Sequence, residues 1–329
     1  MKIALITPAG ARSRSGNRHT ALRWAEMLRS LGHSVRVSLR WDGRAADVMI
    51  ALHARRSHAS IADFSERHPG APLAVVLTGT DLYRDIRTDR DARASLDLAD
   101  RLVVLQDMGK LELAPRLRRK TLVIYQSAEV PPSRRRRSQG FRIAVLGHLR
   151  EEKDPFRTAL ALAHLGDLPD LEVVHLGEAL SPAMAREARR LMRRDVRYRW
   201  IGNVPHRSAL DWLAGSRLLV LSSRMEGGAN VVCEAAAAGV PVIASRVSGN
   251  IGMLGSAYPG YYRLGDERAL AREIRRAVRD PAYYARLKRL TAARRPLFQP
   301  AAEREGLRRL LAELQPRSIS SRTGAKLRR

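Results

Sequence analysis

Residues 217–245 read RLLVLSSRMEGGANVVCEAAAAGVPVIAS, and the apolar pattern changes twice along them. The run 217–223 is short, apolar and bounded by polar residues, which predicts a buried strand. A loop, RMEGGA, leads into a helical run from Asn230 that ends at Gly239. VPVIAS (240–245) predicts the next strand. A strand, a helix and a second strand in succession favour two parallel neighbours in one sheet.

The same alternation extends in both directions along the chain and occurs in two series. Between the predicted strands, residues 20–33 predict a helix whose apolar face is Leu22, Ala25, Met27, Leu28 and Leu31, ended at Gly32. Residues 263–280 predict another helix. The predicted strands are 2–8, 34–41, 47–53, 72–79, 101–106 and 121–126 in the first series, and 141–147, 171–177, 198–202, 217–223 and 240–245 in the second. The fold class is therefore α/β, with two Rossmann-like doubly wound domains.

The segment PPSRRRRSQG (131–140) separates the two series. Its prolines and charges are typical of an exposed linker, and an anion-binding arm is the alternative. We therefore expect an N-terminal domain over 1–130 and a C-terminal domain over 141–300. A C-terminal helix over 301–315 and a disordered basic tail over 316–329 should follow.

The net charge of +27 is carried almost entirely by arginine, since the 329 residues include only six lysines. One interpretation is an anionic partner such as nucleic acid, a membrane surface or a phosphorylated substrate. The other is a compositional bias with arginines on solvated helix faces, which their spread along the chain favours. The single Cys233 excludes an internal disulfide, and no signal peptide or membrane span is evident. These features predict a cytoplasmic protein without integral membrane association.

Two carboxylates flank the start of the helix within 217–245. The loop residues Gly227 and Gly228 would let backbone approach a ligand, and Asn230 is a suitable N-cap. The free N–H groups near Ala229 would then favour a phosphate. Glu226 and Glu234 accept hydrogen bonds only, and sugar hydroxyls donate them, so the arrangement suits a nucleotide sugar. The alternative is that both are ordinary surface acids.

This region resembles the donor site of GT-B glycosyltransferases related to family 4, through the E-x7-E spacing of Glu226 and Glu234 before AAAAGVPVIAS. The loop GHLREEKDP, from Gly147, resembles that family's G-R-L-x-x-x-K loop, whose basic side chains bind the donor diphosphate. Lys153 matches the family lysine, while His148 replaces the arginine and Arg150 is a possible substitute. SGNIG, which includes Ser248, Gly249 and Asn250, falls at the family's glycine-rich phosphate loop.

The resemblance extends with less specificity to the first domain. SGNRHTALRWAEML (15–28) resembles the opening loop and first helix of the family, and TGTDLY (78–83) matches its H-G-T-D stretch with Thr78 in place of histidine. The expected acceptor-binding residues are Gly16, Asn17, Arg18, His19, His53, Thr78, Gly79 and Thr80. The basic side chains of Arg12, Arg14, Arg55 and Arg56 suggest a small anionic acceptor, with solvated loop charge as the alternative.

The resemblance implies a two-domain fold with the ligands in a cleft between the domains, no cofactor, and catalysis without a metal. Lys153, Arg150 and Glu226 would be the catalytic residues. The one D-x-D, Asp89-Arg90-Asp91, lies in a polar helical stretch and reads as a chance occurrence. No His/Cys ligand cluster is evident, and Cys233 reads as a buried helix residue.

In detail the chain resembles one bacterial subgroup, the selenosugar synthases of selenoneine biosynthesis, which join selenophosphate to a UDP-sugar. The acceptor would then need no general base, consistent with Thr78. Alternatives are an oxygen acceptor, a UDP-sugar epimerase or hydrolase, and a basic nucleic-acid-binding protein. The last is supported only by net charge, and without an RNA-binding aromatic signature we expect no nucleic-acid partner.

Overall fold

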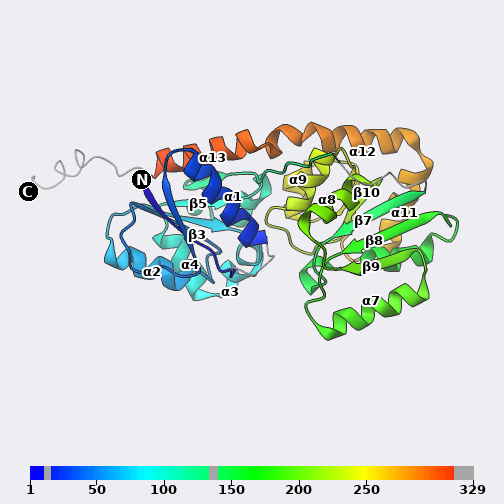
Figure 1. Ribbon diagram of the computed structural model, residues 1–329, viewed down its shortest axis with the longest axis horizontal. Coiled ribbons are helices and arrows are strands. Elements are labelled where there is room, and N and C mark those ends of the chain that lie inside the picture. Colours follow the sequence, from blue (N-terminus) through cyan, green and yellow to red (C-terminus); the bar gives the residue numbers. More distant parts are fainter. Residues whose placement is uncertain (11–15, 133–139, 315–329) are drawn as a thin grey trace, which may run out of the picture. The chain divides into compact units, whose positions relative to one another are not determined.

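The computed structural model describes residues 1–10, 16–132 and 140–314, which form two α/β units (Figure 1). Unit 1 contains Met1–Val104, Leu113–Ile124 and the residues from Arg304 on, and unit 2 contains Leu105–Glu112 and Tyr125–Glu303. The chain thus leaves unit 1 after Val104, returns for one short segment and returns again in its last helix. The domain boundaries expected from the sequence include neither of these two returns to unit 1. Residues 133–139 of the predicted linker and the tail 316–329 lie outside the described residues.

Unit 1 is built on a six-stranded, wholly parallel sheet in the order β2-β1-β3-β4-β5-β6. All five residues of β3 and of β4 are buried, as expected for central strands covered by helices on both faces. The strands are β1 (Lys2–Ile6), β2 (Ser34–Ser38), β3 (Val48–Leu52), β4 (Leu73–Leu77), β5 (Arg101–Val104) and β6 (Thr121–Val123). The helices are α1 (Gly16–Ser30), α2 (His58–Arg67), the π-helix η1 (Asp81–Asp85), α3 (Ile86–Thr88), α4 (Arg90–Leu98) and α5 (Pro115–Arg118).

Unit 2 has a second parallel sheet in the order β12-β11-β10-β7-β8-β9. Numbered within the unit, this is the 3-2-1-4-5-6 order of dinucleotide-binding folds. The strands are β7 (Phe141–Leu146), β8 (Leu171–Leu176), β9 (Tyr198–Gly202), β10 (Leu218–Leu221), β11 (Val242–Ser245) and β12 (Tyr261–Tyr262). The α-helices are α6 (Arg157–Ala161), α7 (Pro182–Arg194), α8 (His206–Ala214), α9 (Asn230–Ala238), α10 (Ser248–Leu254), α11 (Glu267–Arg279) and α12 (Pro281–Ala293).

Short 3-10 helices and the last α-helix complete the fold. α13 (Pro300–Glu313) begins in unit 2 and continues in unit 1, where Arg101 and Glu313 form an ion pair of 2.9 Å. The 3-10 helices are η2 (Asp107–Glu112), η3 (Glu151–Lys153), η4 (Leu162–His164) and η5 (Arg295–Phe298). The predicted α/β class with two doubly wound sheets is confirmed. Every predicted strand is present, β9 with the predicted bounds and the others shorter at one or both ends.

Three local predictions need correction. β12 was not predicted, because two residues give no readable apolar pattern. The first helix begins at Gly16 rather than residue 20, and Leu22 is 45% exposed while Trp24 is buried, so its inner face is rotated from the predicted one. The N-cap of α9 is Ala229, and Asn230 is the first helical residue. The predicted helix ends at Gly32 and Gly239 are present, and both glycines adopt positive φ there.

Candidate active site

The order of the strands in unit 2 decides where a ligand can bind. β7 pairs with β10, and between them the chain order reverses, so the loops after these strands diverge at one edge of the sheet. These are the loops that carry Lys153 and Glu226. Lys153 Nζ donates to Glu226 Oε2 at 2.5 Å, with the side chains 18% and 11% exposed. Two residues singled out by the sequence, 73 positions apart, are therefore joined.

The β10 loop holds Lys153 in place through backbone contacts. Ser222 Oγ donates to the carbonyl oxygens of Lys153, at 3.0 Å, and of Asp154, at 2.8 Å. Asp154 adopts the left-handed conformation with a φ of +44°, which is uncommon for non-glycine residues and is tolerated best by Asn and Asp. Ser223 Oγ donates to Glu226 Oε2 at 2.9 Å. The carboxylate therefore receives two hydrogen bonds on one oxygen.

The first residue of the β7 loop is fixed from β8. Nε2 of the buried His175 lies 3.3 Å from the Gly147 carbonyl, and its Nδ1 lies 2.9 Å from the Tyr198 hydroxyl. Burial lowers the pKa of His175 to about 4, so the ring is neutral and can donate to Gly147 from Nε2. Gly177 must be glycine, since a Cβ there would lie 2.0 Å from the Gly147 oxygen. His175 and Gly177 were missed by sequence reasoning.

The two further basic candidates of this loop differ in their surroundings. His148 Nδ1 accepts from the Glu178 N–H at 3.1 Å, which ties it to the end of β8. Arg150 is exposed, and it forms no ion pair with any described residue. Its guanidinium can therefore turn toward an anion without first breaking an ion pair.

The predicted glycine-rich segment 248–252 packs directly on the Glu226 loop. A Cβ on Gly249 would lie 1.8 Å from the Glu226 carbonyl oxygen, so only glycine allows this approach. Asn250 Nδ2 donates to the Ser245 carbonyl and lies 3.0 Å from Ser245 Oγ, and Ser245 Oγ donates to the Ser223 carbonyl. The loop after β10 and the start of α10 therefore form one hydrogen-bonded group. Ser248 Oγ and Asn250 Oδ1 are buried there without a hydrogen-bond partner.

The start of α9 explains the small residues around the two glutamates. A Cβ on Gly228 would lie 2.5 Å from Cβ of Leu105, and Ala229 is buried. Packing against Leu105 therefore also requires glycine at position 228, in addition to the predicted approach of a ligand. Gly227 lies in the same loop. Glu234 Oε1 lies 2.8 Å from Nε2 of His206, with the side chains 12% and 56% exposed. His206 was not predicted, because no motif links it to Glu234. Cys233 is buried, as predicted.

Unit 1 has an equivalent edge, where the strand order reverses between β1 and β3. The predicted residues His53, Thr78, Gly79 and Thr80 follow β3 and β4 there. His53 is buried with a φ of +72°, its Nδ1 accepts from the Arg56 N–H, and its Nε2 lies 3.0 Å from Thr80 Oγ1. Nδ1 is thus the acceptor, so in the neutral ring Nε2 carries the proton and donates to Thr80.

A buried carboxylate, missed by sequence reasoning, organises this edge. Asp81 accepts from the N–H groups of Thr78 and Gly79 through one oxygen and of Ala54 through the other. Asp85 accepts from Arg55 Nε at 2.9 Å. Burial lowers the pKa of His53 and Arg56 acts in the same direction, whereas Asp81 opposes the shift. Arg55 is therefore already paired within the protein.

The predicted residues at the other side of this edge lie at the start of α1. Thr20 Oγ1 donates to the Gly16 carbonyl, and Thr7 Oγ1 lies 3.5 Å from the Asn17 carbonyl. Arg18 is partly exposed and His19 is exposed. Arg12 and Arg14 lie outside the described residues.

The remaining sequence features have structural explanations. Asp89 is the N-cap of α4 and accepts from the Ala92 N–H at 2.8 Å, which accounts for one carboxylate of the D-x-D. Within residues 1–10, 16–132 and 140–314, no group of three or more His, Cys, Asp or Glu side chains could hold a metal. In the same ranges, every helix is too short or too polar to cross a bilayer.

Comparisons with known proteins agree with this geometry. The family model described as "Glycosyl transferases group 1" matches residues 127–294. None of the curated proteins matches the sequence significantly. Three solved structures illustrate the likeness: HepE from Anabaena with UDP and glucose, sucrose-phosphate synthase from Thermosynechococcus elongatus, and the pneumococcal O-GlcNAc transferase with UDP and GlcNAc.

The likeness to these structures covers nearly the whole chain. The TM-scores are 0.73, 0.76 and 0.66, with identities of 15%, 17% and 17%. The matches cover 94%, 95% and 90% of this chain and 99%, 99% and 60% of the others. At these identities the likeness establishes the GT-B fold.

Proposed function

Because this chain belongs to the group 1 glycosyl transferases, we propose that it transfers a sugar from a UDP-sugar to a small anionic acceptor. The observation that carries the proposal is the Lys153–Glu226 contact at the strand-order reversal of unit 2. A lysine amine suits a diphosphate and a carboxylate suits sugar hydroxyls, and here both lie at one edge of one sheet. Proteins of this fold bind UDP with glucose and UDP with GlcNAc, and this supports a UDP donor.

The reaction would develop negative charge on the departing diphosphate. Lys153 and Arg150 would stabilise that charge, together with the N–H groups at the start of α9. Glu234, positioned by His206, would accept from the ribose hydroxyls, and Glu226 from those of the sugar. Because these groups supply the charge compensation themselves, we propose catalysis without a metal or cofactor.

For the acceptor we propose selenophosphate, with UDP-N-acetylglucosamine or UDP-glucose as donor, as in selenoneine biosynthesis. The selenium would attack the anomeric carbon, forming a carbon–selenium bond while the bond to the UDP oxygen breaks. Selenium is already anionic, so no base must remove a proton. The edge of unit 1 supports this choice, because the His53 ring donates from Nε2 and is not poised as a base there.

The test is to incubate the protein with either UDP-sugar and selenophosphate and to identify the product by mass spectrometry. We expect a selenium isotope pattern on a hexose-derived product, with UDP released in equal amount. Free sugar or an isomerised UDP-sugar, unchanged by selenophosphate, would indicate a hydrolase or an epimerase. Transfer only to hydroxyl compounds would indicate an oxygen acceptor.

A basic nucleic-acid-binding protein remains the alternative of another class, and it rests on the net charge of +27. It requires an affinity for nucleic acid that falls steeply with salt. Protection of the protein by UDP against thermal unfolding, without such affinity, would exclude it.

A further inference from the structure

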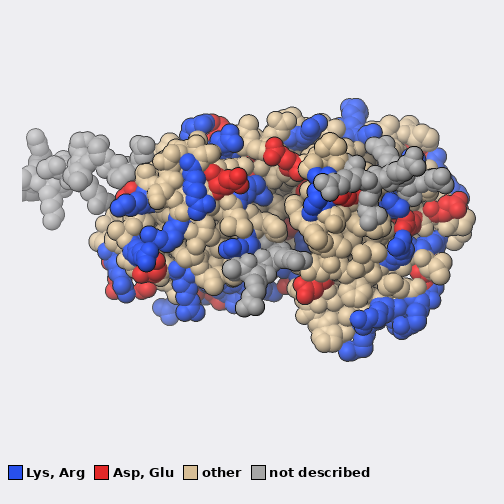
Figure 2. Space-filling model, viewed as in Figure 1, with Lys and Arg blue, Asp and Glu red and all other residues tan. Residues whose placement is uncertain are grey.

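A dense group of arginines covers α7, a helix that carries none of the residues predicted for either site. Figure 2 shows Lys and Arg scattered over the visible face of both units, with a concentration over this helix. The group, called here the α7 arginine face, consists of Arg186, Arg189, Arg190, Arg193 and Arg194, all exposed. α7 buries Ala188 and Leu191, which leaves the arginines on the outside.

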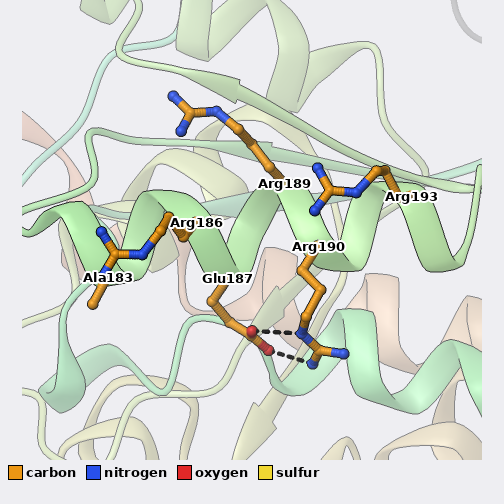
Figure 3. Close-up of a pocket in the computed structure, with 6 residues that line it drawn as sticks. All are labelled: Ala183, Arg186, Glu187, Arg189, Arg190 and Arg193. Atoms are coloured by element: carbon orange, nitrogen blue, oxygen red, sulfur yellow. Dashed lines mark hydrogen bonds and ion pairs between the residues drawn. The ribbon is translucent and has the colours of Figure 1, made fainter.

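Few of the described residues neutralise this charge. Glu187 is the one acidic residue of α7, and both its oxygens accept from Arg190, at 2.6 and 2.7 Å (Figure 3). Asp195, which ends the helix, is held by Arg197. No described residue forms an ion pair with Arg186, Arg193 or Arg194. The helix therefore presents an excess of positive charge that fits a surface rich in phosphate.

Two exposed aliphatic side chains flank the same helix. Leu180 lies two residues before Pro182 and is 55% exposed, and Val196 lies two residues after Arg194 and is 87% exposed. They are separated by a helix of 13 residues, about 20 Å long. Exposed aliphatic groups at both ends of a basic helix gain nothing from contact with free phosphate or a nucleic-acid backbone. They gain free energy in contact with the apolar boundary of a lipid layer.

We propose that the α7 arginine face docks on an anionic phospholipid surface, with Leu180 and Val196 entering the headgroup region. The arginines supply attraction to the lipid phosphates, and their aliphatic stems can lie along the interface. The contact is peripheral and reversible, because the apolar face of α7 stays packed in unit 2. The residues involved are distinct from those of the proposed transfer reaction, so either proposal can fail alone.

The test is co-sedimentation with phosphatidylcholine vesicles, with or without about one third phosphatidylglycerol, a fraction that sets a negative surface potential. The test variants are Arg186→Glu/Arg193→Glu and Leu180→Ser/Val196→Ser. The matched control is Arg268→Glu/Arg272→Glu, which makes the same charge change at exposed positions of α11. Unfolding midpoints and UDP binding verify that each variant is folded.

We expect salt-sensitive binding to the anionic vesicles and none to phosphatidylcholine alone. Each basic residue near such a surface adds roughly fivefold to binding, so the α7 charge variant should bind roughly 25-fold more weakly or worse. The Leu180→Ser/Val196→Ser variant should lose part of the vesicle binding, and the α11 control should lose little of it. Absence of binding to anionic vesicles, or equal losses in the α7 and α11 variants, would overturn the proposal. A third outcome would also overturn the proposal: the protein binds duplex DNA as well as vesicles, and the Leu180→Ser/Val196→Ser variant binds both as well as wild type does. The surface would then recognise phosphate alone.

Discussion

Replacing Lys153 by methionine should separate a catalytic lysine from one that only neutralises Glu226. The change keeps most of the side-chain volume and removes the amine that lies 2.5 Å from Glu226 Oε2. If Lys153 stabilises the leaving diphosphate, its loss should lower kcat by roughly 100- to 1,000-fold, the usual effect of removing one preorganised donor. This corresponds to about 2.7–4 kcal/mol in the activation free energy.

The loss of folding stability should be smaller. The two side chains are 18% and 11% exposed, which lies between a surface pair and a fully buried one. We therefore expect the free energy of unfolding to fall by about 2 kcal/mol. A protein stable by about 5–15 kcal/mol remains folded after such a change, so unfolding would not account for the lost turnover.

The assay is the rate of UDP release at saturating substrates, with thermal unfolding measured in parallel. The deciding control is the double variant Lys153→Met/Glu226→Gln, in which no carboxylate is left unpaired. It should stay about 100-fold or more below wild type. Turnover of Lys153→Met close to wild type, or recovery in the double variant, would refute a role for Lys153 at the diphosphate.

Three other variants test the surroundings of the site. Gly249→Ala should lower the free energy of unfolding by about 1–3 kcal/mol, since its Cβ would lie 1.8 Å from the Glu226 oxygen; an unchanged urea midpoint would contradict that packing. The pKa of His175 falls from 6.5 in the unfolded chain to about 4 on folding. Its contribution to the free energy of unfolding is therefore complete above pH 6.5 and is lost as pH falls through 4. This amounts to about 3 kcal/mol, and His175→Phe should flatten that part of the stability profile measured by urea unfolding. Glu234→Gln should weaken UDP binding about tenfold by calorimetry, and unchanged affinity would remove Glu234 from the ribose site.

The fold was readable from the sequence because central parallel strands are apolar along their whole length. β3, β4 and β10 are wholly buried and are seen as short apolar runs between polar loops. β12 was missed because it has only two residues. The excursion of residues 105–112 into unit 2 and the packing of the last helix in unit 1 were not predicted. The apolar period of an element shows which of its faces is buried, but not which unit that face packs against.

The residues proposed for the site were named partly from residue type and spacing and partly from the resemblance to a glycosyltransferase family. Lys153 and Glu226 were both named, and their contact follows from two neighbouring strands that end at one edge. Asp81, His175 and His206 act by holding other residues in place, and no local sequence pattern predicts these contacts. The N-cap was wrong because Asn230 was judged by its capping propensity, whereas the chain enters the helix one residue earlier.

The return of α13 to unit 1 has a consequence for folding during synthesis. Gly306 lies against Ile124, where an added Cβ would be 3.0 Å from that side chain, so the last helix completes unit 1. A ribosome must translate all of Tyr125–Glu303 before that helix exists, which takes roughly 10–40 s at about 5–20 residues per second. Unit 1 therefore waits, with Ile124 and its neighbours uncovered, while unit 2 is made and can fold. Although most of unit 1 is synthesised first, we expect unit 1 to complete its folding after unit 2.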